Sequence, residues 1–203
     1  MRVRITFSKQ GALRYTGHLD LHKILERSIR RARLPLAYSQ GYHPQPKLNL
    51  AAALPLGFSS RAEVMDIWLN EDVEEVVSAL QSNVPPGLTI LDSKPVDDRE
   101  PSLQSQVIAA EYQVEITEAD SEAGLTEKIA IVMESESIPR VRRKKEYDLR
   151  PLIEELSPTD DNNIFMRLTA REGATGRPEE VLDVLGIPLE ATRIERTRLL
   201  FTG

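Results

Sequence analysis

The apolar residues of this chain follow the same order of strand and helix periods twice, beginning at Arg2 and again at Val107. Apolar and polar residues alternate over residues 2–7, which indicates a half-buried strand. Apolar residues recur every three or four positions over residues 18–33, which indicates an amphipathic helix. The first repeat is completed by the following expected elements: strands 48–53 and 62–69, helix 72–80 and strand 88–91.

The second repeat has the same order of elements. Its expected elements are strand 107–117, helix 125–133, an extended basic segment 138–147, a helical turn within 148–156, strand 164–170, a helix that starts at Pro178 and ends at Leu185, and strand 192–201. Residues 93–106 combine prolines and charges with few apolar side chains, which is typical of a linker. The order strand–helix–strand–strand–helix–strand is that of a ferredoxin-like unit. We therefore expect an α+β protein with two tandem ferredoxin-like units, at 1–92 and 107–203, joined by the linker 93–106.

The net charge of −6 hides three segments of unlike charge. Residues 1–50 have a net charge of +8, residues 51–137 of −14, and residues 138–203 of 0. A strongly basic first quarter favours a nucleic acid or an acidic protein surface as partner. The alternative is that this basic segment folds against the acidic middle of the same chain.

The absence of cysteine removes several classes of function. A chain without cysteine has no disulfide framework, no thiolate zinc site, no iron–sulfur cluster and no cysteine nucleophile. The glycine motifs that hold nucleotide phosphates are also missing, so we expect no cofactor. The longest apolar run, residues 50–56, is far shorter than the roughly 20 residues that cross a bilayer, and residues 1–4 have no apolar signal core. We expect a soluble, cytoplasmic protein without a membrane partner.

The helix expected at 18–33 carries a stripe of cations opposite its apolar face. Residues three and four apart are neighbours on a helix, so Lys23, Arg27 and Arg30 lie together, with Arg31 and Arg33 close by. These cations repel one another and suit a row of phosphates along a nucleic-acid backbone. A solvated helix face is the alternative interpretation.

The segment from Tyr38 to Lys47 is punctuated by glycine and proline and carries groups that recognise bases. Aromatic rings stack on unpaired bases, and amides and imidazoles hydrogen-bond to base edges. The side chains of this kind in the segment are Tyr38, Gln40, Tyr42, His43, Gln45 and Lys47. The alternatives are a structural loop whose tyrosine rings fill the core, or a site for a small anionic ligand.

A second basic run lies at 138–150. On a single strand, Arg140, Arg142 and Lys144 would share one face, with Arg143 on the other. We expect this run to add to an RNA-binding surface; a charged sheet edge that resists aggregation is the alternative.

All three histidines lie in the first quarter of the chain. His18 and His22 are four residues apart, which suits a metal ion if His43 or Asp20 supplies a third ligand, but we expect no metal site. His18 or His43 could act as general acid or base in metal-independent RNA cleavage. We expect instead that His18 and His43 contribute to binding.

Several short motifs resemble one known family. They are Ser8-Lys9, Gly11, Leu13-Arg14-Tyr15, Gly17-His18-Leu19-Asp20, Arg30-Arg31-Ala32, Leu34-Pro35, Tyr38-Ser39-Gln40-Gly41, His43-Pro44, Pro46-Lys47, Leu54-Pro55-Leu56-Gly57, Tyr147–Ile153 and Arg177–Leu182. With these motifs the chain resembles the radical-SAM-linked domain family of unknown function. The resemblance implies a domain found beside or fused to a radical SAM protein, in an RNA-directed context and without a defined reaction.

These observations predict an RNA-binding accessory module, non-catalytic, that presents ribosomal or transfer RNA to a partner enzyme such as a radical SAM protein. The residues expected to bind RNA are Lys9, Arg14, Tyr15, His18, Lys23, Arg27, Arg30, Arg31, Arg33, Tyr38, Gln40, Tyr42, His43, Lys47, Arg140, Arg142, Arg143 and Lys144. The alternatives are a metal-independent endoribonuclease that uses His18 or His43, and a protein adaptor whose basic helix docks on an acidic partner.

Overall fold

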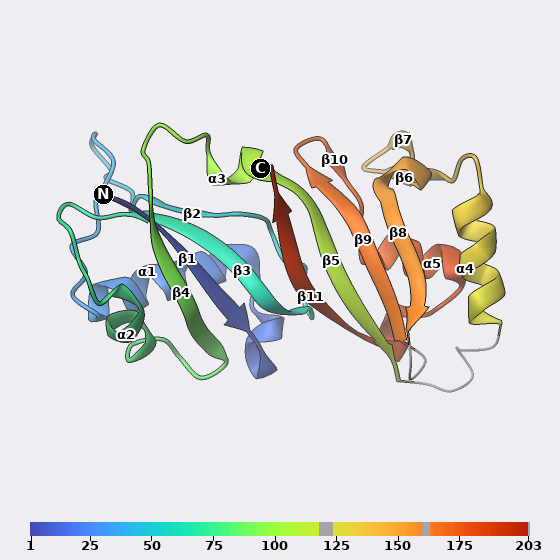
Figure 1. Ribbon diagram of the computed structural model, residues 1–203, viewed down its shortest axis with the longest axis horizontal. Coiled ribbons are helices and arrows are strands. Elements are labelled where there is room, and N and C mark those ends of the chain that lie inside the picture. The colour runs from blue at the N-terminus through green and yellow to red at the C-terminus, as the bar shows by residue number, and fades with distance from the viewer. Residues whose placement is uncertain (118–123, 160–162, 203) are drawn as a thin grey trace. The chain divides into compact units, whose positions relative to one another are not determined.

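The computed structural model is mixed α and β, as expected, and divides into two compact units, Met1–Val107 and Ile108–Gly203. The structure describes residues 1–117, 124–159 and 163–202. Helix α1 lies behind the strands of the first unit and α5 lies behind the strands of the second (Figure 1). None of the helices in these ranges combines the length and apolar character needed to cross a membrane.

The first unit contains four strands and three α-helices. Its elements are β1 (Arg2–Lys9), the 3-10 helix η1 (Gly11–Tyr15), α1 (His18–Arg31), β2 (Leu48–Leu50), β3 (Ser59–Trp68), α2 (Val76–Gln81), β4 (Leu88–Val96) and α3 (Leu103–Gln106). The strand order is β4-β1-β3-β2, and each neighbouring pair is antiparallel. The expected strands and helices are present, with β2 and α2 shorter and β4 longer than predicted.

The core of this unit lies between one face of the sheet and the helices. Alternate residues of β1 point into it, and Val3 pairs in register with Ile67 while Ile5 pairs with Met65. Leu25 and the other apolar residues of α1 complete the cluster. Helical periodicity therefore buries one face of α1 and leaves the opposite face to solvent.

The other face of this sheet carries a buried ionic network. Asp66 accepts hydrogen bonds from Nε of Arg2 at 2.9 Å and from Nε of Arg4 at 2.8 Å. Arg2 also donates to the carbonyl of Pro101 at 3.0 Å, and Arg4 donates to Oε1 of Gln106 at 3.2 Å. The segment expected as a linker is therefore tied to the first unit at residues 101 and 106, and its first residues, 93–96, belong to β4.

The second unit has a longer series of elements. They are β5 (Val107–Ile116), α4 (Leu125–Glu134), β6 (Pro139–Arg142), β7 (Lys145–Asp148), η3 (Arg150–Leu152), β8 (Ile153–Thr159), β9 (Asn163–Arg171), β10 (Ala174–Thr175), α5 (Pro178–Leu185), η5 (Leu189–Ala191) and β11 (Thr192–Phe201). Strand β9 pairs antiparallel with both β5 and β8, and β5 lies next to β11. The sheet order is therefore β11-β5-β9-β8, with β10 also on the outer edge of β9.

The segment 138–147 differs from its expected form. It is not one strand of the sheet but a separate two-stranded hairpin, β6–β7, that turns at Arg143 and Lys144. The sheet strand in this place is β8, where a bulge between Ile153 and Glu155 interrupts the alternation. Because a bulge breaks the period of two, the apolar spacing there does not indicate a strand.

Candidate nucleic-acid interface

Helix α1 presents its cations on the exposed face, as its periodicity predicts. Lys23 lies 3.7 Å from the exposed Asp20, and Arg30 lies 3.5 Å from the half-buried Glu26, each one helical turn away. Because both cations are exposed, such pairs contribute little and exchange readily with other partners. The exposed Arg27 has no hydrogen bond or ion pair within the described part of the chain.

Two other arginines of this stripe have a more defined local role. Arg31 donates to the carbonyl of Asn83 at 2.7 Å and to Oγ of Ser28 at 3.2 Å, so it fastens α1 to the end of α2. Arg33 ends the helix in the left-handed region, with φ of 55°. This position usually carries glycine, because a Cβ costs energy there. Lys23, Arg27 and Arg30 are therefore the cations of α1 best placed to meet a partner.

The segment from Tyr38 to Lys47 is a projecting loop with a fastened base. Isolated bridges pair Leu36 with Leu69 and Tyr38 with Pro46, and the amide of Ala37 donates to the carbonyl of Trp68 at 2.7 Å. The backbone amide of Ser39 donates a hydrogen bond to the carbonyl oxygen of Gln45 at 2.8 Å, which closes the base of the loop. The loop base is thus attached to the edge of β3, while residues 40–44 form an exposed tip.

The tyrosine rings of this loop do not fill the core. The side chain of Tyr42 is fully exposed, and Tyr38 retains 37% of its surface. Gln40, His43 and Lys47 are exposed as well. The structure therefore leaves open the base-stacking interpretation and the small-anion interpretation, and removes the alternative of core packing.

Of the predicted RNA-binding residues before α1, some lie at the surface and one is buried. The guanidinium of Arg14 lies over the ring of Tyr15, 4.7 Å from its centroid, and that ring is 61% exposed. Lys9, in contrast, is completely buried, and its Nζ donates to the carbonyl of Thr16 at 2.9 Å. Lys9 therefore supports the turn before α1 from inside, since its ammonium does not reach the surface.

The three histidines have different surroundings. His22 faces the sheet, with Nε2 3.2 Å from the carbonyl oxygen of Leu48. His18 is exposed at the first position of α1, and His43 is exposed at the loop tip. Within the described ranges, no three His, Cys, Asp or Glu side chains come together in a way that could hold a metal ion.

The hairpin β6–β7 uses two of its predicted RNA-binding arginines internally. Arg140 pairs with Asp183, and Arg142 pairs with Glu180, with 2.9 Å between Nε of Arg142 and Oε1 of Glu180. Arg142 also stacks on the ring of Tyr147. Both acidic partners belong to α5, so these arginines attach the hairpin to that helix.

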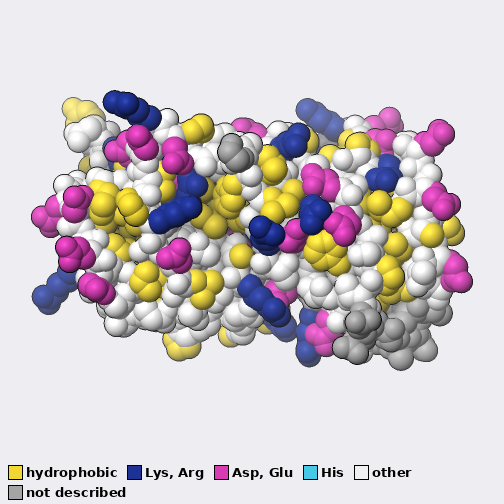
Figure 2. All heavy atoms as spheres, in the orientation of Figure 1, with side chains coloured by type: hydrophobic (Ala, Val, Ile, Leu, Met, Phe, Trp, Pro, Cys, Tyr) yellow, Lys and Arg dark blue, Asp and Glu magenta, His cyan; other side chains and the backbone are white. Residues whose placement is uncertain are grey.

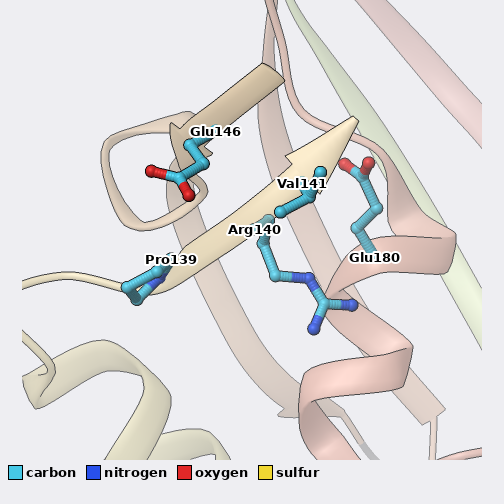
Figure 3. Close-up of a pocket in the computed structure, with 5 residues that line it drawn as sticks. All are labelled: Pro139, Arg140, Val141, Glu146 and Glu180. Atoms are coloured by element: carbon cyan, nitrogen blue, oxygen red, sulfur yellow. The ribbon is translucent and has the colours of Figure 1, made fainter. Parts of the chain in front are cut away.

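The hairpin borders an open hollow of about 530 Å³ lined by Pro139, Arg140, Val141, Glu146 and Glu180 (Figure 3). In this view, Glu146 and Glu180 lie on opposite sides of the β6 ribbon. The charged groups Arg140 and Glu180 already pair with other residues. The hollow therefore offers few unengaged polar groups to a small ligand.

The acidic groups that hold the hairpin are stabilised as anions. Burial opposes the charge of Glu180, but hydrogen bonds from Arg142 and Tyr147 outweigh it and lower the pKa of its carboxyl. The backbone amides of Ile138 and Arg150 donate to Asp148 at 2.7 and 2.9 Å, and they lower its pKa. The folded state therefore favours the charged carboxylate form of both Glu180 and Asp148.

The turn of the hairpin holds the remaining two predicted residues of this run. Arg142 and Lys145 form the last pair of the ladder, so Arg143 and Lys144 are its two turn residues, with φ of 50° and 67°. A two-residue turn with positive φ at both positions normally contains asparagine or glycine. Each L-residue with a side chain costs about 1–2 kcal/mol in this conformation. Lys144 therefore lies at the turn and not on a strand face with Arg140 and Arg142.

Sequence reasoning did not find the ionic pairs on the sheet faces. Besides the network at Asp66, Arg167 of β9 binds Glu111 of β5 at 2.8 Å and Glu155 of β8 at 2.9 Å. The strand face shown in Figure 2 accordingly mixes both signs of charge with apolar side chains. Charged residues at alternate strand positions were the only sign of these ion pairs in the sequence. Their partners are distant along the chain, so the sequence pattern does not identify them.

Comparison with protein families matches residues 2–178 to the family described as "Uncharacterized protein conserved in bacteria (DUF2344)". The chain belongs to this family. The DUF2344 match includes the cations of α1, the loop 38–47 and the hairpin. The DUF2344 description assigns no activity and names no radical SAM protein.

Comparisons of this chain with individual proteins do not indicate an activity. No curated protein matches the chain. Among solved structures, a chain of a Cbf5-Nop10-Gar1 complex is 9% identical with a TM-score of 0.44, over 97% of this chain and 48% of that one. The small subunit of acetolactate synthase from Thermotoga maritima is 7% identical with a TM-score of 0.27, over 99% and 95%. This chain thus spans about half of the length of the first neighbour. At these TM-scores, neither similarity indicates a function for this chain.

Proposed function

We propose that this protein is a non-catalytic RNA-binding module whose first unit presents ribosomal or transfer RNA to a partner enzyme, such as a radical SAM protein. The observation that carries the proposal is that cations of α1 and the tip of the loop 38–47 are exposed. The chain leaves α1 at Arg33, enters the loop at Tyr38, and returns to α1 where Leu48 meets His22. One continuous segment therefore supplies both kinds of group.

These two sets of exposed groups suit the two parts of an RNA strand. Lys23, Arg27 and Arg30 supply positive charge along a helix face, which matches a row of phosphates. Tyr42 supplies an exposed ring on which an unpaired base can stack. Because its base is fastened to β3, the loop loses less conformational entropy on binding than a free loop would.

We infer further that each unit is ferredoxin-like. The strand orders β4-β1-β3-β2 and β11-β5-β9-β8 place corresponding elements of the two units in corresponding positions. In many such RNA-binding domains, bases stack on the sheet. The sheet face of the first unit suits this mode poorly, because Arg2 and Asp66 are buried there beneath the segment at Pro101. Binding through α1 and the loop is the arrangement that these contacts favour.

A salt titration of RNA binding tests the proposal. We expect the affinity for ribosomal or transfer RNA, measured by filter binding, to fall with increasing salt. The combined variant Lys23→Gln, Arg27→Gln and Arg30→Gln should flatten the slope of log affinity against log salt by about 2, at about 0.7 per phosphate on a single strand. A matched control removes three exposed cations elsewhere: Lys94→Gln, Arg99→Gln and Arg198→Gln. The control should retain most of the slope.

The same assay separates the alternatives. An adaptor for an acidic protein would bind RNA no better than an unrelated acidic protein does. A ribonuclease would cut RNA at a defined position without metal, and the cut would disappear in His18→Ala or His43→Ala while binding persisted. The presentation role additionally requires that a partner enzyme co-purify with the protein together with RNA.

A further inference from the structure

The turn of the hairpin β6–β7 combines an unfavourable backbone with three neighbouring cations. Arg143 and Lys144 occupy turn positions with positive φ, for which asparagine or glycine would be better suited. Lys145 follows directly, and all three side chains are exposed. Unfavourable backbone conformations persist where the surrounding structure imposes them, and they concentrate at functional sites.

The surrounding structure imposes this conformation from the base of the hairpin. Arg142, immediately before the turn, is bound by Glu180 and stacks on Tyr147. Arg140 is bound by Asp183, and at the other end Asp148 accepts the amides of Ile138 and Arg150. The hairpin is therefore fastened to α5 by two ion pairs, Asp148 closes its base, and its turn projects from that base.

The cations of this basic run fall into two groups. Arg140 and Arg142 are neutralised by carboxylates of α5. In the part of the chain that the structure describes, Arg143, Lys144 and Lys145 have no ion pair or side-chain hydrogen bond. The sequence pattern alone does not distinguish these groups. The positive charge left for a partner is concentrated at the turn.

We propose that Arg143, Lys144 and Lys145 form a second phosphate-binding site for RNA, separate from the surface of α1 and resting on the RNA-binding function proposed above. The three side chains offer charge without an aromatic ring or an amide, so the site contacts the backbone and does not read sequence. An acidic protein is less suitable as the partner, because an interface needs apolar anchors and, within the hairpin, Val141 is the one large hydrophobic side chain that is exposed. The fixed base holds the cations in place before RNA arrives, which reduces the entropy lost on binding.

A variant that improves the turn while removing its charge tests this inference. Arg143→Asn combined with Lys144→Gly places favoured residues at both positive-φ positions, and thermal unfolding should show an unchanged or higher midpoint. RNA affinity should nevertheless fall by about tenfold at low salt, and the salt slope should flatten by about 1.4 for two lost phosphate contacts. A second variant, Arg143→Gln with Lys144→Gln, removes the same charges with less change of backbone preference. Its RNA affinity and its salt slope should fall by the same amounts. The control Arg193→Gln with Arg198→Gln removes two exposed cations from β11 and should leave affinity nearly unchanged.

The outcomes separate this site from the proposed function. If both turn variants bind RNA as tightly as the native protein, while neutralised α1 weakens binding, the second site is wrong and the RNA-binding function stands. If native protein does not bind RNA, both proposals are wrong. If turn and control variants lose affinity equally, the effect is one of total charge, and the second site is again wrong.

Discussion

Asp66 shows how strongly a single carboxylate can organise this fold. Its side chain is completely buried on β3, and it neutralises both Arg2 and Arg4 of β1. The hydrogen bonds that Arg4 donates to Asp66 raise the pKa of Arg4 above the ordinary value, against the opposing effect of burial. Because both arginines also bind residues between 100 and 106, the carboxylate indirectly holds that segment on the sheet.

Replacement of Asp66 by alanine should therefore be severely destabilising. The variant leaves two guanidinium groups without their main acceptor, one of them fully buried, and breaking such a pair costs about 3–5 kcal/mol. Urea unfolding followed by circular dichroism measures the change. Glu71→Ala, at an exposed position, serves as control and should stay within about 0.5 kcal/mol of the native protein. A loss below about 1 kcal/mol for Asp66→Ala would contradict this account.

At the scale of elements, the hairpin β6–β7 depends on charge for its position. It does not pair with the sheet through β6 or β7 and is held by ionic and capping contacts instead. Two of the carboxylates concerned, Glu180 and Asp148, have lowered pKa values in the folded protein. A group with a lowered folded pKa contributes stability above its unfolded value, near pH 4, and loses it as the pH falls through the folded value.

We therefore expect acid to release the hairpin from α5. The ring resonances of Tyr147, which lies beneath Arg142, should shift as the pH is lowered from about 4.5 to the lowered pKa values. In Glu180→Gln the same resonances should already be displaced at neutral pH, because the amide does not neutralise Arg142. Tyr147 resonances that stay constant across this range, in a protein that remains folded, would show that ionic contacts do not hold the hairpin.

At the scale of the whole molecule, charge is distributed unevenly along a chain whose net charge is −6. Residues 1–50 have a net charge of +8, and several of these cations lie together on α1. An exposed charge acts over about 10 Å at 0.1 M salt, so a partner responds to the local surface and not to the net charge.

The protein should therefore bind a polyanion in spite of its acidic composition. We expect retention on immobilised heparin at pH 7 and low salt, with elution as salt increases. The variant with neutralised Lys23, Arg27 and Arg30 should elute much earlier, whereas neutralised Lys94, Arg99 and Arg198 should change elution little. Passage of the native protein without retention would mean that the acidic segments cancel the field of α1.

Local periodicity was sufficient for much of the fold and of the interface. Alternation identified β1, β5 and β9, and a run that is apolar on both sides identified β3. Three-to-four spacing identified α1, and a proline followed by two glutamates identified the start of α5. These patterns follow from the geometry of each element itself. The same spacing predicted that the cations of α1 lie opposite its buried face. Proline and glycine marked the loop 38–47, but only the structure shows that Tyr42 is exposed and not in the core.

Partners distant along the chain were decided by tertiary structure alone. Lys9, Arg31, Arg140 and Arg142 are indistinguishable by sequence pattern from cations that face solvent. In the folded chain Arg31 meets Asn83, and Arg142 meets Glu180, because α2 and α5 come to lie beside them. A side chain's charge and its position within an element follow from the local sequence. Whether a carboxylate or a carbonyl oxygen neutralises that charge depends on which remote segment packs against it, and this decides which cations remain for a partner.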